Sequence, residues 1–148
     1  MPFLIKEEYF DIPTEFEVTF FFEGKLYRYG LSLDDGKISE EWLYWTKTNR
    51  ETMLFQRNGQ KIIINERSFS EAKDFVRQNN GVLEVDKTKD FIPFVSVLSQ
   101  FNGEKSNSVV KWFWKLNLMS GISDQGVKGF TSVHDNFFKS MKYLTFYH

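Results

Sequence analysis

Residues 16–30 read FEVTFFFEGKLYRYG, and the spacing of their apolar side chains predicts the first elements of the fold. Apolar side chains recur at every second residue from Phe16 to Phe22, which is the period of a pleated β-strand. The same alternation resumes at Tyr27 after a short turn that contains Gly24. Two alternating runs that flank a short glycine-containing turn predict a β-hairpin.

Three further stretches continue this pattern. KISEEWLYWTK (37–47) and ETMLFQR (51–57) are typical of strands, and the dipeptide Asn58-Gly59 predicts a tight turn before a last strand in KIIIN (61–65). Consecutive strands joined by short turns pair with their neighbours in antiparallel fashion. The sequence therefore predicts a five-stranded antiparallel meander over about residues 15–65.

The rest of the chain has a helical period. Ser68 with Glu71 forms a capping-box pattern, and a helix that begins there would end at Asn80-Gly81. VLEVD (82–86) fits one short strand or an extended link, and Asp90 can cap the next helix.

Two more helices are predicted toward the end of the chain, from Ser106 to Gly121 and from about Ser132 onward. The fold class is therefore α+β, with an N-terminal meander of about five strands followed by about four helices. We expect one domain over residues 1–148, with the helical part at about 68–148.

The predicted sheet carries large apolar groups on both faces. Trp42 and Tyr44 alternate with Leu43 and Trp45, so the third strand has an aromatic ring on each side. A solvated face of an antiparallel sheet is normally polar, so we expect both faces to be covered, one by helices of this chain and the other by further helices or by a partner. The candidate partner-facing aromatic residues are Phe21, Tyr27, Tyr29, Trp42, Tyr44 and Trp45.

Composition excludes several classes of function. The net charge of −1 argues against binding nucleic acid or membranes through bulk charge, and no apolar run is long enough to span a bilayer. The chain has no cysteine, which excludes disulfides and thiolate metal sites and fits a reducing compartment. We expect a cytoplasmic protein whose partner is another protein, with nucleic acid disfavoured.

No catalytic, cofactor-binding or metal-binding residue is predicted. NGEKS (102–106) resembles the end of a phosphate-binding loop but lacks its upstream glycine, so we interpret it as a turn between helices. His134 and His148 are isolated, and Glu40 and Glu41 are neighbours in a strand and point to opposite faces.

The order of several pieces resembles a known family. TEFEV (14–18), YRYG (27–30), ISEEWLY (38–44) and MLFQR (53–57), followed by FVSVLSQFNGE and WFWKLNLMSGISD, resemble the middle of AAA-type ATP-binding proteins of the SMC/RecF-like branch, which are associated with abortive infection and bacterial defence. The resemblance implies an antiparallel β-subdomain at 16–64 that leads into a helical lobe at about 68–148. The P-loop, signature and Walker B motifs of that family would lie outside this chain, so ATP and Mg²⁺ would bind only in a full-length context.

Two functions remain open at this point. The first is a non-catalytic domain or fragment of such an ATP-binding protein, not an enzyme by itself, that acts in interaction or regulation with a second copy or the remainder of the ATPase. The second is a stand-alone module that binds a hydrophobic small ligand or another protein through its aromatic strands.

Overall fold

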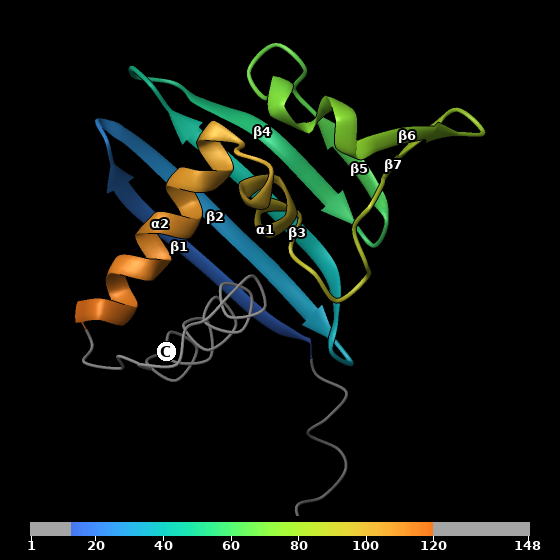
Figure 1. The fold of residues 1–148 in the computed structure, drawn as a ribbon, viewed down its shortest axis with the longest axis horizontal. Coiled ribbons are helices and arrows are strands. Elements are labelled where there is room, and N and C mark those ends of the chain that lie inside the picture. The colour runs from blue at the N-terminus through green and yellow to red at the C-terminus, as the bar shows by residue number, and fades with distance from the viewer. Residues whose placement is uncertain (1–12, 120–148) are drawn as a thin grey trace, which may run out of the picture.

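The computed structural model describes residues 13–119 of the 148-residue chain. These residues form one seven-stranded antiparallel sheet in the order β1-β2-β3-β4-β5-β7-β6 (Figure 1). The strands are β1 Thr14–Phe22, β2 Lys25–Asp34, β3 Lys37–Thr46, β4 Glu51–Asn58, β5 Lys61–Ile64, β6 Val76–Asn79 and β7 Val82–Val85. The first five strands follow chain order, so the predicted meander is confirmed.

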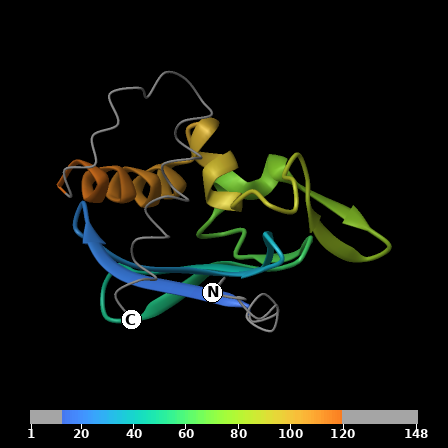
Figure 2. The same cartoon turned by 90° about the horizontal axis from the view of Figure 1, so that it is seen from below.

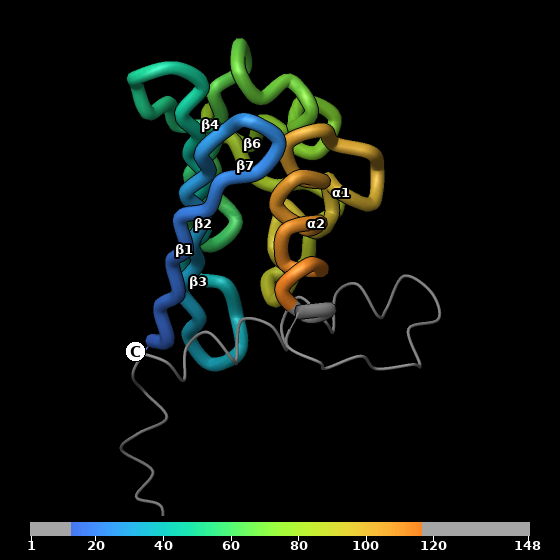
Figure 3. The backbone as a smooth tube through the Cα atoms, turned by 90° about the vertical axis from the view of Figure 1, so that its left-hand side faces the viewer, coloured from blue at the N-terminus to red at the C-terminus, as the bar shows by residue number. Residues whose placement is uncertain are grey.

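Helices cover one face of this sheet. A 3-10 helix, η2 (Ser70–Phe75), and two α-helices, α1 (Phe94–Gln100) and α2 (Glu104–Met119), all lie on the same side. Figures 2 and 3 show this two-layer arrangement, with the sheet as one layer and the helices as the other. The α+β class is therefore confirmed.

Aromatic side chains fill the space between the two layers. Phe20 stacks on Trp112 of α2 with ring centroids 4.3 Å apart, and Phe16 packs against Phe113 at 6.0 Å. Further along the sheet, Phe55 of β4 meets Phe94 of α1 edge to face at 5.3 Å. The aromatic hairpin of residues 16–30 thus supports α2, and β4 supports α1.

The predicted helix after Ser68 is wrong beyond its first turns. Only the short η2 forms there, and the chain then continues into β6, so part of the predicted helical region is a β-hairpin. Asn80 and Gly81, predicted to end the helix, instead form the turn between β6 and β7, with φ values of 50° and 79°. Positive φ at both positions is the geometry of a tight hairpin turn, for which Asn-Gly is the favoured dipeptide.

We predicted that both faces of the sheet are covered. Among residues 13–119, helices cover only one of the two faces. The turn predicted for 102–106 is confirmed only at its start, because α1 ends at Gln100 and α2 already begins at Glu104, two residues before the predicted helix start at Ser106. The helix predicted from about Ser132, together with His134 and His148, lies outside the described residues.

Candidate functional site

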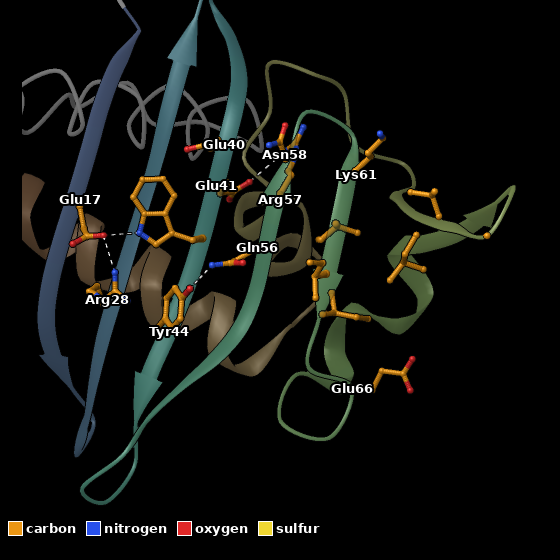
Figure 4. Close-up of a pocket in the computed structure, with 17 residues that line it drawn as sticks. Glu17, Arg28, Glu40, Glu41, Tyr44, Gln56, Arg57, Asn58, Lys61 and Glu66 are labelled. Carbon is orange, nitrogen blue, oxygen red and sulfur yellow. Dashed lines mark hydrogen bonds and ion pairs between the residues drawn. The ribbon is translucent and has the colours of Figure 1, made fainter.

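The face of the sheet opposite the helices is called the open face below. It is formed by the outward side chains Glu17, Thr19, Phe21, Arg28, Glu40, Trp42, Tyr44, Gln56, Asn58, Lys61 and Ile63. A groove of about 1030 Å³ runs across it and reaches Val82 and Leu83 of β7 (Figure 4). Because no helix among residues 13–119 covers this face, it is the natural candidate for a binding surface.

Arg28 holds the centre of the open face together. Its Nε and one terminal nitrogen donate hydrogen bonds to the two carboxylate oxygens of Glu51, at 2.8 and 3.1 Å. Its other terminal nitrogen donates to Glu17 Oε2 at 3.0 Å, and its guanidinium carbon lies 4.2 Å from the ring centroid of Tyr44. One arginine therefore ties β1, β2, β3 and β4 together by charge-assisted bonds and a cation–π contact.

These contacts change the ionisation of the groups involved. The hydrogen bonds from Arg28 lower the pKa of Glu51 below its usual range. The same bonds to Glu51 raise the pKa of Arg28, so the guanidinium stays charged at every pH at which the protein is studied.

Trp42 lies flat across the neighbouring strand because Gly30 has no side chain. A Cβ atom added at Gly30 would stand 2.3 Å from the Trp42 ring and 2.7 Å from the backbone oxygen of Phe16, distances that real atoms do not tolerate. The indole Nε1 reaches across β2 and donates a hydrogen bond to Glu17 Oε2 at 2.6 Å. A strand glycine that lets another group approach closely is a recognised use of the residue.

Tyr44 completes the arrangement on the side of β4. Gln56 Nε2 donates a hydrogen bond to the Tyr44 hydroxyl, and the two side chains meet in the groove in Figure 4. Trp42 and Tyr44, the two rings of the third strand on the open face, are therefore each held at the polar edge by a hydrogen bond to a side chain of another strand.

The six predicted partner-facing aromatics divide between the two faces. Phe21 is 69% exposed, and Trp42 and Tyr44 are half-buried on the open face; that these three face a partner stays a prediction. Tyr27 and Tyr29 are buried in the core, so the expectation that they face a partner is wrong. Trp45 is also on the helix side, where it packs near Tyr27 and lies under Lys25 and Lys105.

A buried polar cluster on the helix-covered face was missed by the sequence analysis. Glu41 and Arg57 form an ion pair of 3.2 Å, and neither side chain is exposed. The guanidinium also donates to the backbone oxygens of Gly59, Lys89 and Ile92 and to the side-chain oxygen of Gln60. With Glu41, five acceptors match the five N–H donors of arginine, so Arg57 has no donor left for a ligand.

Both carboxylate oxygens of Glu41 also accept hydrogen bonds within the protein, and Glu41 caps the start of α1. Its carboxylate accepts hydrogen bonds from the backbone N–H groups of Phe94 and Val95, at 2.7 and 3.2 Å, and from the Tyr29 hydroxyl at 3.0 Å. These amides are among the first of the helix and lack partners within it. Burial raises the pKa of Glu41 and of Tyr29, while Arg57 and the two amides lower that of Glu41.

Asp90, predicted to cap this helix, has another role. It forms an ion pair with Lys37 at 3.4 Å, while its backbone oxygen accepts from the N–H of Ile38. The capping residue of the predicted box, Glu71, also acts elsewhere, because it accepts from the backbone N–H groups of Lys105 and Ser106 at the start of α2. Both helix starts are thus capped by glutamates from distant segments.

A signal for the buried pair was present in the sequence. In the period-two pattern, Glu41 falls on the same face as Leu43, and Arg57 falls on the same face as Phe55. Glu41 and Arg57 are also paired directly in the register of β3 with β4. Two opposite charges at inward positions of neighbouring strands predict a buried ion pair. The expectation that Glu40 and Glu41 point to opposite faces is confirmed.

Residues 13–119 contain no group of three or more His, Asp or Glu side chains placed to hold a metal ion. No helix within that part of the chain is long and apolar enough to cross a membrane.

Comparisons with known proteins found no match to a protein family, to a curated protein or to a solved structure.

Proposed function

We propose that this chain is a non-catalytic interaction module, and that the open face of its sheet binds a partner protein. The observation that carries the proposal is the grouping of Trp42, Tyr44 and Arg28 at the centre of an uncovered sheet face. Tryptophan, tyrosine and arginine are the residue types that most often dominate the binding energy of protein interfaces. Phe21 and Ile63, 69% and 61% exposed, extend the same surface at its two ends.

The hydrogen-bond network of the open face supports this reading. Glu17 and Gln56 hold the polar edges of Trp42 and Tyr44, so these rings do not need to be ordered when a partner arrives. Side chains that are fixed before binding lose less conformational entropy, which leaves more of the contact energy as affinity.

Charges around the groove favour one kind of partner. Arg28 is neutralised by Glu17 and Glu51, which leaves Glu40 and Glu66 against Lys61 along the lining. The excess of negative charge that remains in the lining repels a phosphate backbone. It favours a protein surface with apolar and cationic side chains. We propose a cytoplasmic location on the same grounds as before, since the chain has no cysteine.

The partner that we propose is the P-loop-containing remainder of an SMC/RecF-like ATP-binding protein. The motifs quoted from residues 14–57 support it, and the family relationship stays a prediction. In that context ATP and Mg²⁺ bind to the remainder, and this module braces or regulates it.

The test begins with the genomic neighbourhood. A neighbouring or continuous reading frame that encodes Gly-x-x-x-x-Gly-Lys-Ser/Thr would be expressed with this chain, and the affinity measured by calorimetry. Phe21→Ala is expected to weaken binding about tenfold or more, as for a contact at an interface. Phe101→Ala is the matched control, because Phe101 is 63% exposed but follows α1 on the helix side, and binding should change less than twofold.

Equal affinities for the wild-type chain and the Phe21 variant would contradict the open face as the binding surface. Binding of ATP by this chain alone would contradict the non-catalytic assignment.

A hydrophobic small ligand is the second candidate, and the size of the groove favours it. A volume of about 1030 Å³ lined by Trp42, Ile63 and Val82 is at the upper end of what small-molecule sites occupy. Native mass spectrometry of the purified chain would show a co-purified apolar molecule that is lost in Ile63→Glu. A spectrum with only the bare chain would count against this candidate.

A further inference from the structure

Strand β1 has an edge with which nothing else among residues 13–119 pairs. It lies at one end of the strand order, and its nine residues pair with β2 from Thr14 to Phe22 without a shift in register. The other side of such a strand presents a regular row of backbone N–H and C=O groups. Those groups are a ready template for another strand.

The opposite edge of the sheet is protected, and β1 is not. At that end, β6 has only four residues, and its Arg77 and Asn79 both contact Glu84 of β7. Short length and charged side chains are the usual means of keeping an edge strand from pairing. β1 is nine residues long and has no proline, lysine, arginine or bulge; its two charged residues, Glu15 and Glu17, both lie in its N-terminal half, and its Phe21 is exposed.

We propose that β1 pairs in antiparallel fashion with β1 of a second copy of this chain, with Val18 on the twofold axis. Such an axis stands perpendicular to the sheet, so both helix layers lie on the same side of one continuous sheet. Residues equally distant from Val18 then face each other. Phe16 lies opposite Phe20 of the second copy on the helix-covered side, and Glu17 lies opposite Thr19 on the open face.

Side-chain charges and strand length select this register over its neighbours. A twofold axis at Glu17 would place two Glu17 side chains opposite each other. Like charges that face each other across strands are destabilising. An axis at Thr19 would pair only residues 16–22 of β1, because the strand ends at Phe22 and Glu23 lies in the turn. With the axis at Val18, Glu15 faces Phe21 and no like charges are opposed.

The same register covers apolar surface. The Val18 side chain is half-buried and packs against the core, and in the pair it meets its own symmetry mate. Phe16 of one copy meets Phe20 of the other across the junction. Because Phe20 stacks on Trp112 of α2, the core becomes continuous between the two copies. α2 lies over β1 and β2 in Figures 1 and 2, which places the two α2 helices on either side of the axis.

Sedimentation equilibrium of the purified chain over a concentration series tests the pairing. We expect a monomer–dimer equilibrium that responds to charge at position 19, because Thr19 is exposed and faces Glu17 of the second copy. Thr19→Glu should raise the dissociation constant on the order of tenfold, and Thr19→Lys should lower it by a similar factor, since two such pairs form in each dimer.

This charge test separates association from stability of the single chain. Thr19 is also opposite Arg28 of β2 within one copy. Thr19→Glu therefore gains attraction inside the monomer while losing it in the dimer, and Thr19→Lys does the reverse. Opposite trends are expected in dimer affinity and in the urea midpoint of unfolding, the midpoint being measured at a concentration at which the chain is monomeric, and parallel trends would overturn the assignment.

Cross-linking tests the register, since the chain has no cysteine of its own. Val18→Cys brings two thiols to directly opposite positions, with Cα atoms about 4.5–5.5 Å apart, within reach of a disulfide. Phe21→Cys is more exposed, but its two copies would be about 20 Å apart, six strand residues of about 3.4 Å each. Rapid oxidation to a covalent dimer is expected only for Val18→Cys.

Two results would overturn the proposal: a chain that stays monomeric up to several hundred micromolar, or equal cross-linking of the two variants. Neither result bears on the open face, because the Phe21→Ala and Phe101→Ala comparison is made with a different partner and remains valid for a monomer.

Discussion

Each face of the sheet carries an arginine that bridges strands to glutamates, and the two arginines differ in their surroundings. Arg57 and Glu41 are fully buried on the helix-covered face, whereas Arg28 and its partners Glu17 and Glu51 are 31–44% exposed on the open face. The chemistry of the bonds is the same. The buried pair cannot exchange its partners for water, and the exposed pair can. The bonds of the covered face are therefore shielded from solvent, whereas those of the open face compete with water and are screened by salt.

The largest expected effect comes from breaking the buried pair. Glu41→Ala removes the carboxylate that balances the buried Arg57 charge and that accepts hydrogen bonds from the amides of Phe94 and Val95 and from the Tyr29 hydroxyl. The free energy of unfolding should fall by about 3–5 kcal/mol in urea denaturation. A double change, Glu41→Leu with Arg57→Met, should cost less than the two single changes added together. A loss below about 1 kcal/mol for Glu41→Ala would contradict the described cluster.

Gly30→Ala should have the next largest effect, because the new methyl group would collide with the Trp42 ring and the Phe16 backbone. Overpacking of this kind costs about 1–3 kcal/mol. In a Trp42→Ala background the same change should cost less, since only the backbone contact remains, and urea denaturation of all four proteins gives the coupling. Equal costs in both backgrounds would mean that the ring does not lie over Gly30.

Removing the cap of α2 should have a smaller effect. Glu71→Ala leaves the amides of Lys105 and Ser106 unpaired and should lower stability by about 1 kcal/mol. Glu66→Ala, an exposed glutamate a few residues earlier, is the matched control and should change stability by less than about 0.5 kcal/mol. If the two variants were equally stable, the capping role of Glu71 would be wrong.

Replacing the exposed Arg28 should lower the stability least of these changes. Its clearest effect should be on the pKa of Glu51. Arg28→Gln is expected to cost no more than about 1 kcal/mol, with a smaller cost at high salt. Because Arg28 lowers the pKa of Glu51, the attraction is present above the ordinary pKa of that carboxyl and is lost as pH falls through the lowered value. NMR titration of Glu51 should show its pKa return toward the ordinary value in Arg28→Gln, and an unchanged pKa would rule out the described contact.

The sequence predicted the sheet better than the helices, because the features that specify these strands lie close together in the sequence. Strands β1 to β5 are specified by alternation and, at three of their four connections, by a turn that contains glycine, and both are properties of neighbouring residues. The stretch after Ser68 has a helical period as well, but Asn80-Gly81 favours a hairpin and pairing with β7 decides the outcome. The helix caps could not be predicted in this way, because Glu41 and Glu71 come from distant segments.

The candidate site was predicted in part. Alternation separated Trp42 and Tyr44 from Trp45, yet it could not tell which side the helices would cover. Tyr27 and Tyr29 were therefore assigned to a partner, although they support α2 through contacts of the core. Which face stays open is a property of the long-range packing of α1 and α2, and the local pattern carries no information about it.

The capping of both helices by earlier residues has a consequence for how the chain folds as it is made. Glu41 precedes the amides it binds by 53 and 54 residues, and Glu71 precedes its own by 34 and 35. During synthesis from the N-terminus, each carboxylate has left the ribosome before the helix it anchors. The meander can therefore assemble first and serve as the template on which α1 and then α2 are nucleated, in the order in which they are translated.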